Sequence, residues 1–338
     1  MRTSISGSQL RFRGLKIAQT WKCNAACEHC AVAAGPRSVE HLRLPTALDC
    51  ISDAASLGLA TIELTGGEAF LASGELTHII LRATELGLAS IVDTNAFWAV
   101  TPKAALVRLN PLREAGLRSI VISTDRWHQR FVPLDRVLYA IDAARELGIG
   151  CSVTICVLAD DYEALDTVWP LRERGIKVKL QSIVPVGRAV TMPAASMLTC
   201  SFAEAATPCE NLYFPTVGPD GRVTICCAPP QWFPRTTAEL CPLCLGWLAK
   251  NSLREILIAA QNSSLLKQLA SLGIGGLYEH LPEFGQVPRN LLQRRYCGRC
   301  DLCTTVLTNP TYLTPLLNSP SLRIENRGCS DDAHAVVV

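Results

Sequence analysis

The chain has 338 residues, of which 49% are hydrophobic and 18% are charged, so it can bury a sizeable core and is not expected to be disordered. Its formal net charge is +2 and it contains no long basic block, which argues against a nucleic-acid groove. It has no run of 18 apolar residues and no apolar signal region at its start, so we expect a cytoplasmic protein without a membrane span.

Six short runs rich in Ile, Val, Leu and Thr indicate β-strands in the first half of the chain. Their composition is typical of strands that are covered on both faces. The strands are expected at residues 15–20, 61–64, 89–93, 118–123, 151–158 and 178–184. The helices between them are expected at about 46–57, 74–86, 101–111, 135–147 and 162–173, with Pro111 ending the third.

Strands that alternate with helices predict a parallel sheet with right-handed crossovers. Six βα units are too few for a closed eight-stranded barrel, so the predicted fold class is α/β, with a partial (βα)6 TIM-like barrel over residues 14–190. Ligands of such folds bind at the carboxyl ends of the strands. We therefore expect functional residues in the loops that follow these strands.

The second half of the chain has a different character. Residues 191–310 are predicted to form a smaller, Cys-rich α+β domain. It should contain a strand at 222–227, a helix at 253–272 and a dense cysteine group at 297–303. Residues 311–338 are predicted to be a loosely ordered tail.

Sixteen cysteines are many for a reducing compartment, where clustered cysteines more often bind metals or do chemistry than form disulfides. Cys23, Cys27 and Cys30 follow the first strand with the spacing C-x3-C-x2-C, so their thiolates can converge on one metal centre. Three thiolates are one short of the four that a four-iron cluster usually takes, which leaves one iron open to a ligand. The alternative is a structural zinc ion with His29 or His41 as the fourth ligand.

This cysteine triad resembles the signature of the radical S-adenosylmethionine superfamily. The resemblance implies that the triad holds a [4Fe–4S] cluster whose open iron binds S-adenosylmethionine. An electron from the cluster would then cleave the cofactor and yield a 5′-deoxyadenosyl radical. The residue before the last cysteine is usually aromatic in the superfamily; here it is His29, whose imidazole we expect near the adenine.

Polar segments at the ends of the next strands fit the same resemblance. Gly66, Gly67 and Glu68 resemble the segment that binds the methionine amine in the superfamily, where glycine permits close backbone approach and a carboxylate can accept from an ammonium. Asn95 follows the third strand and could hydrogen-bond the cofactor or the substrate.

The fourth and sixth strands end in further candidates. Ser123 and Asp125 are two residues apart, so on an extended segment they project the same way and suit ribose hydroxyls or the methionine carboxylate. Asp125 could instead cap the turn that follows it. Arg188 lies in a Gly-Arg-Ala segment similar to one found in many members, and it could pair with the cofactor carboxylate or face solvent.

The C-terminal cysteines resemble the SPASM and twitch extensions of the superfamily, which bind auxiliary [4Fe–4S] clusters. Cys209, Gly221 and Cys226 match the spacing C-x(9–15)-G-x4-C, whereas the later cysteines are spaced more closely than in the extensions. We therefore expect one auxiliary cluster; zinc at this second site is the alternative. The preferred ligands are Cys209, Cys226, Cys300 and Cys303, with Cys227, Cys244 and Cys297 in reserve.

Cys226 and Cys227 should point to opposite faces of a regular strand, so both are not expected to bind the same cluster. The spare thiol, Cys227, is the catalytic candidate, because a thiol that faces the active site can give a hydrogen atom to a carbon radical and so permit epimerisation. The alternative is that the spare cysteine is a buried apolar side chain.

Enzymes with such extensions often modify ribosomally made peptides, so the leading hypothesis is a peptide maturase that forms crosslinks or epimerises residues. A small-molecule radical dehydrogenase or tailoring enzyme is the second hypothesis, and a non-catalytic metal-binding scaffold is the third. The expected partners are a peptide or small-molecule substrate and a reductase or flavodoxin-type electron donor, with no nucleic acid and no membrane.

Overall fold

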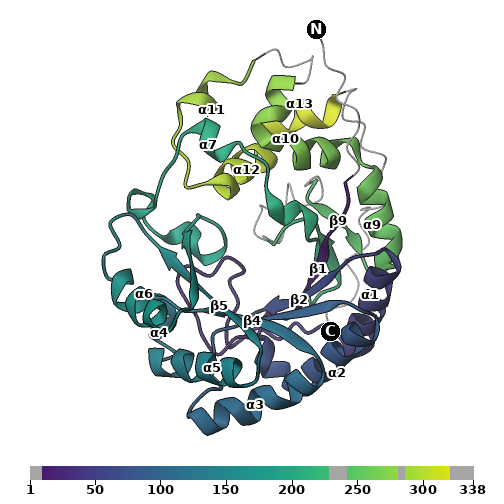
Figure 1. Ribbon diagram of the computed structural model, residues 1–338. Coiled ribbons are helices and arrows are strands. Elements are labelled where there is room, and N and C mark those ends of the chain that lie inside the picture. The colour runs from purple at the N-terminus through teal and green to yellow at the C-terminus, as the bar shows by residue number, and fades with distance from the viewer. Residues whose placement is uncertain (1–9, 228–241, 281–285, 320–338) are drawn as a thin grey trace.

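The computed structural model describes residues 10–227, 242–280 and 286–319. One nine-stranded sheet organises them, in the order β6-β5-β4-β3-β2-β1-β7-β8-β9. The first six strands pair in parallel and form the expected partial barrel, with helices around its outer face (Figure 1). These strands are β1 Gly14–Thr20, β2 Thr61–Gly66, β3 Ala89–Thr94, β4 Leu117–Ser123, β5 Gly150–Val157 and β6 Lys177–Ser182.

The helices of this half follow the predicted alternation. They are α1 Leu44–Ser56, α2 Ser73–Glu85, α3 Pro102–Glu114, α4 Arg126–Gln129, α5 Leu134–Glu146 and α6 Ala164–Glu173. The prediction that Pro111 ends the third helix is wrong, because α3 continues to Glu114. A proline removes one hydrogen bond, here to the carbonyl of Val107. Val107 is 66% exposed, so water can satisfy that carbonyl.

The two faces of the sheet differ, which corrects the expectation that both are covered. In β2, Ile62 and Leu64 are fully buried toward the helices, whereas Glu63 and Thr65 on the other face are only half-buried. The same alternation runs through β3, where Val92 is buried and its neighbours are not. A closed TIM barrel fills its interior with bulky apolar side chains. Here side chains of the inner face, Glu63, Ile91 and Asp93 among them, are only half-buried, and we call the space on this side of the sheet the lumen.

The C-terminal half extends the same sheet on the far side of β1. The strands β7 Thr216–Val217, β8 Arg222–Thr224 and β9 Cys244–Trp247 follow β1 in that order. The predicted strand at 222–227 is therefore shorter than expected. The hairpin between β7 and β8 is antiparallel, and β7 runs parallel to β1.

Helices cover the rest of this half. The single helix predicted at 253–272 is two helices, because the chain breaks at Ser263. The remaining elements are α7 Phe202–Ala205, α9 Leu253–Asn262, α10 Ser264–His280, α11 Arg289–Gln293, α12 Arg299–Thr308 and α13 Pro310–Asn318, with short 3-10 turns at Ala69–Ala72, Gly187–Thr191, Ala194–Ser196 and Glu210–Tyr213. Helix α13 occupies the start of the segment predicted as a tail, and the remainder from 320 onward lies outside the described residues. The boundary near residue 190 stays a prediction.

Across the described ranges, no helix combines the length and the apolar character that a bilayer crossing requires.

Candidate functional site

The three N-terminal cysteines lie on one loop at the carboxyl end of β1. Cys23 and Cys27 are buried, and Cys30 is half-buried. Backbone bonds fold the loop back on itself: the Cys23 amide donates to the Gly35 carbonyl at 3.1 Å, and the Cys30 amide donates to the Cys27 carbonyl at 3.2 Å. The loop thus gathers the three thiols at the end of the barrel where parallel sheets bind their ligands.

The end of β2 holds this loop from one side. The Gly67 amide donates to the Thr20 carbonyl at 2.7 Å, and the Glu68 amide donates to the Lys22 carbonyl at 2.9 Å. A Cβ atom on Gly67 would lie 2.1 Å from the Lys22 carbonyl oxygen, which no side chain can do. The two glycines are therefore needed for backbone contact with the cysteine loop itself.

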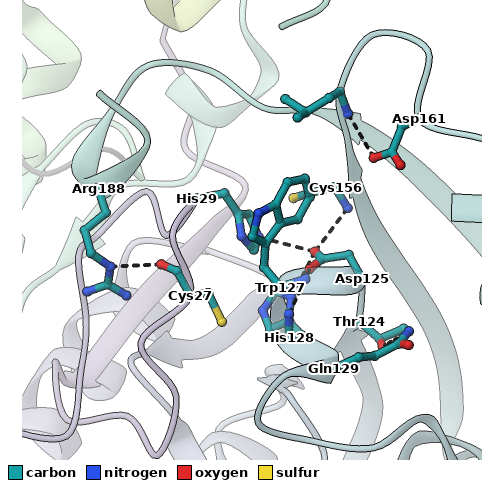
Figure 2. Close-up of polar contacts among 11 residues, drawn as sticks. Cys27, His29, Thr124, Asp125, Trp127, His128, Gln129, Cys156, Asp161 and Arg188 are labelled. Atoms are coloured by element: carbon teal, nitrogen blue, oxygen red, sulfur yellow. Dashed lines mark hydrogen bonds and ion pairs between the residues drawn. The ribbon is translucent and has the colours of Figure 1, made fainter. Parts of the chain in front are cut away.

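The segment after β6 holds the loop from the other side. Gly187 has φ +60°, and a Cβ atom there would lie 2.3 Å from the carbonyl oxygens of Cys30 and Ala31. The Arg188 amide donates to the Cys30 carbonyl at 3.0 Å, and its Nε donates to the Cys27 carbonyl at 2.8 Å (Figure 2). Arg188 thus faces the loop and not solvent. Two segments about 120 residues apart grip one cysteine loop.

The Glu68 side chain joins the ends of β2 and β3 beside the loop. Its side chain is 1% exposed and accepts from the Phe70 amide, the Thr94 hydroxyl and the Asn95 amide, at 3.1, 2.8 and 2.8 Å. Burial raises the pKa of Glu68 to about 7, although these hydrogen bonds favour its ionised form. The carboxylate that the resemblance assigns to the methionine amine is thus already bonded to the ends of β2 and β3.

Asn95 connects the third strand to the first cysteine. Its Nδ2 donates to Asn24 Oδ1 at 2.9 Å and lies 3.8 Å from Cys23 Sγ. Burial raises the pKa of the Cys23 and Cys27 thiols to about 12 in both cases, and the Arg188 guanidinium acts in the opposite direction. Without a metal these thiols keep their protons; an iron cluster would replace the protons as it binds.

Asp125 follows β4 and lies at the centre of a buried polar group. It caps α4, because its Oδ1 accepts from the amides of Trp127 and His128 at 3.0 Å each. Its Oδ2 lies 2.9 Å from His128 Nδ1 and 3.3 Å from His29 Nε2 (Figure 2). Burial opposes ionisation of Asp125, but the hydrogen bonds from His128 and His29 outweigh it and lower its pKa. The cap foreseen as an alternative is therefore present together with two imidazole contacts.

The imidazole of His29 is held in place by its neighbours. Its ring centroid lies 4.9 Å from that of Trp127 and 5.0 Å from that of His128. Ser123, the last residue of β4, is half-buried and two residues from Asp125, but it is not part of this group in any hydrogen bond among the described residues. The structure thus brings His29 and Asp125 together and leaves Ser123 facing the lumen.

The zinc alternative for the first triad does not fit this geometry. His29 is turned to Asp125, and His41 Nε2 lies 2.9 Å from Glu75 Oε2. A tetrahedral zinc site with Zn–S bonds of about 2.3 Å needs sulfurs roughly 3.8 Å apart. In the described part of the chain, the one set of three donors within 4.8 Å of one another is His29, Asp125 and His128. The triad sulfurs are therefore spread more widely, as a multi-iron cluster would require.

Two polar atoms beside the triad are buried without a hydrogen-bond partner in the described structure: Arg188 Nη2 and His29 Nδ1. A buried donor left unpaired costs roughly 1–3 kcal/mol, so such atoms usually have a ligand. A guanidinium nitrogen suits a carboxylate, and an imidazole nitrogen suits a polar atom of a base or sugar. The residues present therefore fit an iron cluster that carries S-adenosylmethionine.

A second group of cysteines forms in the C-terminal half. Burial raises the pKa of Cys300 to about 12, with Cys227 and Cys209 as the next largest causes, so the three thiols lie near one another. Cys227 keeps exposed surface and lines a small pocket with Trp21 and Thr216, yet enough protein surrounds it for burial to raise its pKa. Cys227, the proposed free thiol, therefore lies near Cys209 and Cys300.

The remaining C-terminal cysteines are placed differently. Cys226 and Cys303 are half-buried against the main core, and Cys244 is buried in β9. Cys297 packs in the same apolar cluster as Cys23 and Cys27, so it lies on the side of the first triad. The ligand set of the second site stays a prediction.

Three neighbours of the site were missed in the sequence. His128 follows Asp125 by three residues on one helical turn, and that spacing was an available signal. Asn24 lies between the cysteines and bonds Asn95. Cys156 packs against the first triad from β5, and its amide donates to Asp125 at 3.4 Å. An isolated cysteine within a strand gave no such indication.

No protein-family model matches the chain. A GTP 3′,8-cyclase of Synechococcus sp. (strain CC9902) is 30% identical over 217 residues, which cover 55% of this chain and 61% of the cyclase. The putative peptide biosynthesis protein YydG of Bacillus subtilis (strain 168) is 23% identical over 221 residues, 62% of this chain and 67% of YydG. The chain spans about three fifths of the length of two such cyclases, 58% and 61%.

Among solved structures, native anSMEcpe with bound AdoMet superimposes with a TM-score of 0.50 and 14% identity, over 74% of this chain and 82% of that one. Its complex with the Cp18Cys peptide gives the same TM-score of 0.50 at 13% identity, over 74% of this chain and 81% of that one. At this level of identity the likeness concerns the fold. It confirms the predicted α/β partial barrel.

The close contact of Gly187 with the cysteine loop predicts that Gly187→Ala impairs assembly of the first cluster. The new Cβ would collide with the Cys30 and Ala31 carbonyls and displace the loop. Anaerobically reconstituted variant should hold about four fewer iron atoms per chain than wild type. Gly74→Ala is the matched control, because a Cβ there meets nothing within 4 Å. Full iron content in Gly187→Ala would contradict the proposed role of this contact.

The lowered pKa of Asp125 predicts an acid-dependent contribution to stability. Its ionised form is favoured in the folded chain, so the contribution is fully present above the unfolded pKa of about 3.9 and is lost as pH falls below that value. Asp125→Asn should destabilise metal-free protein by about 1–3 kcal/mol at pH 7, and the difference should shrink below pH 4. Urea unfolding across this range measures it. Asp135→Asn, at an exposed position, should show neither effect; a gap that stays constant with pH would refute the assignment.

Proposed function

We propose that this chain, a member of the radical S-adenosylmethionine superfamily, generates a 5′-deoxyadenosyl radical and uses it to modify a ribosomally made peptide. The superfamily is the one that its relatives, its fold and its N-terminal cysteines indicate together. The activity and the substrate are the proposal.

The observation that carries the radical chemistry is the tightly held cysteine loop with two buried nitrogen atoms beside it, Arg188 Nη2 and His29 Nδ1, that have no partner among the described residues. Cys23, Cys27 and Cys30 would hold the cluster. Arg188 Nη2 would bind the cofactor carboxylate while its Nε keeps the loop in place. When bound, the cluster and cofactor supply the one-electron cleavage that yields the carbon radical.

The other site residues would orient the cofactor. His29, fixed by Asp125 and Trp127, would present its free Nδ1 to the adenine or ribose. Ser123 at the end of β4 is a second candidate for the ribose. Glu68, whose buried carboxylate is bonded to Thr94 and Asn95, would place negative charge near the methionine ammonium, and an ammonium nearby would favour its ionised form. Asn95 would donate toward the Cys23 sulfur.

Two observations support a peptide as the substrate. The inner face of the barrel carries polar side chains such as Glu63 and Thr65 that are only half-buried, which suits a substrate that carries amide groups. YydG, named a putative peptide biosynthesis protein, aligns over two thirds of its own length. The solved anSMEcpe complex with a peptide supports this only through the shared fold.

The second candidate function is radical modification of a small molecule. It is favoured by the relatives described as GTP 3′,8-cyclases, of which one is 30% identical. The name of those proteins indicates a nucleoside triphosphate, GTP, as their substrate. A metal-binding scaffold without catalysis is disfavoured, because it does not account for the two nitrogen atoms beside the first triad, Arg188 Nη2 and His29 Nδ1, that are buried without a partner among the described residues.

Cys209, Cys227 and Cys300 would form the core of an auxiliary cluster, with a fourth ligand from Cys226 or Cys303. As a ligand, Cys227 could not also donate a hydrogen atom to a substrate radical. An auxiliary cluster that accepts an electron suits oxidative crosslinking, whereas a free Cys227 thiol suits epimerisation. The nearness of Cys227 to Cys209 and Cys300 favours the ligand role.

The first test of this proposal is iron content and cofactor cleavage. Reconstituted protein should hold about eight iron atoms per chain, and with dithionite it should release 5′-deoxyadenosine from S-adenosylmethionine. Cys23→Ala should abolish release. Cys50→Ala, a buried cysteine in α1 outside both groups, should retain it. Release from Cys23→Ala, or none from wild type after full reconstitution, would refute the activity.

The role of Cys227 is tested by the iron content and activity of a Cys227→Ala variant. If Cys227 is a ligand, Cys227→Ala should lose about four iron atoms and still cleave the cofactor at the first cluster. Cys50→Ala, a buried cysteine of α1 outside both groups, is the control and should keep its full iron content. A Cys227→Ala protein with full iron content that no longer incorporates deuterium into a peptide encoded beside it, in deuterated water, would instead assign Cys227 as the hydrogen donor.

A further inference from the structure

The strand β6 ends the sheet on the side away from the C-terminal strands. It pairs with β5, and within the described residues no other backbone segment bonds to its outer edge. In Figure 1, β5 and α6 lie across the centre of the molecule from β1 and β9, so the two ends of the sheet do not meet. An unpaired strand edge presents a row of free N–H and C=O groups.

Two lysines of β6 face the lumen. Cys156 packs against the first cysteine triad, so its side chain points inward. Gln181 pairs with Cys156 in the parallel register and points the same way, and by alternation so do Lys179 and Lys177. Lys179 also acts on Cys156 electrostatically. The free edge therefore carries positive charge on its lumen side.

Within the part of the chain that the structure describes, these charges are not neutralised. No carboxylate of the described residues lies within salt-bridge distance of Lys177 or Lys179, although exposed acidic residues elsewhere are commonly paired. By contrast Lys16, on the opposite wall, is bonded to Glu63. The β6 lysines are exposed and available to an acidic ligand.

The outer side of the same edge is apolar. Leu180 is 54% exposed on β6, on the side opposite to the lysines. On α6, the helix that packs against β6, Leu165 and Trp169 are 60% and 67% exposed and lie four residues apart on one helical face. Apolar side chains that gather beside a free strand edge are typical of a docking surface.

We propose that the free edge of β6 binds the substrate as an added strand, and that the substrate is an acidic peptide. The proposal rests on the peptide-modifying function above. An extended peptide would place alternate side chains into the lumen beside Lys177 and Lys179 and the others outward beside Leu180. The residue to be modified would then point inward, toward the end of the barrel that carries the cysteine triad.

Other occupants fit this edge less well. A second copy of β6 would bring like-charged lysines together, which disfavours edge-to-edge pairing. A nucleoside triphosphate could use the lysines but would leave the N–H and C=O groups of the edge and the exposed Leu180 unused. An acidic peptide satisfies all three features at once.

The test uses fluorescein-labelled (Glu-Val)4 as the probe and reconstituted full-length protein. Anisotropy should report binding that weakens at least tenfold in a Lys177→Glu/Lys179→Glu variant and in a probe N-methylated at every second residue. Lys103→Glu, an exposed charge reversal on α3, is the matched control and should bind as wild type. Hydrogen exchange of residues 177–182 should slow when the probe is added.

Three results would overturn the proposal: equal binding of (Lys-Val)4, unchanged binding to the double variant, or unchanged exchange at β6. Displacement of the probe by GTP, together with unchanged exchange, would assign the lysines to a triphosphate and also overturn it. Release of 5′-deoxyadenosine without peptide should be the same in the double variant and in wild type. That readout separates a failure of this inference from a failure of the proposed activity.

Discussion

The structure depends on one constraint: the backbone of the cysteine loop is held by two contacts, one with the end of β2 and one with the segment after β6. Both contacts use glycines that touch carbonyl oxygens of the loop, Gly67 at Lys22 and Gly187 at Cys30. Because these positions admit no side chain, backbone meets backbone there, and the Arg188 side chain adds a bond to the Cys27 carbonyl of the same loop. A cluster with an open iron needs such fixed ligands, since its chemistry depends on where the open position points.

The polar residues at the strand ends add to this constraint, because they are bonded to the loop and to one another. Glu68 ties β2 to β3, Asn95 ties β3 to Cys23, and Asp125 ties β4 to His29. Each strand end thus supports the cysteine loop from a different direction. What remains free, Arg188 Nη2 and His29 Nδ1, is what a ligand could use.

Much of this arrangement could be predicted from the sequence, because it is encoded locally. Strand composition and glycine stops gave the six strands, and the spacing of Cys23, Cys27 and Cys30 gave the loop. The partners of Glu68 and the contact of Asp125 with His29 could not be predicted, because they depend on which segments meet in space. The neighbours Cys226 and Cys227 show the same limit, since β8 ends at Thr224 and the period of a regular strand no longer applies beyond it.

The half-exposed inner face of the sheet carries charged side chains that extend to the second cysteine group. Lys16 on β1 bonds Glu63 and acts on Cys227, so the charged layer of the lumen reaches the second cysteine group. Burial, with the Glu63 charge next, raises the pKa of Asp93, so this carboxyl ionises less readily than a free aspartate. Lys16 is bonded to Glu63, whereas the β6 lysines are exposed and have no salt-bridge partner among the described residues. Their positive charge therefore favours an acidic substrate at this edge of the sheet.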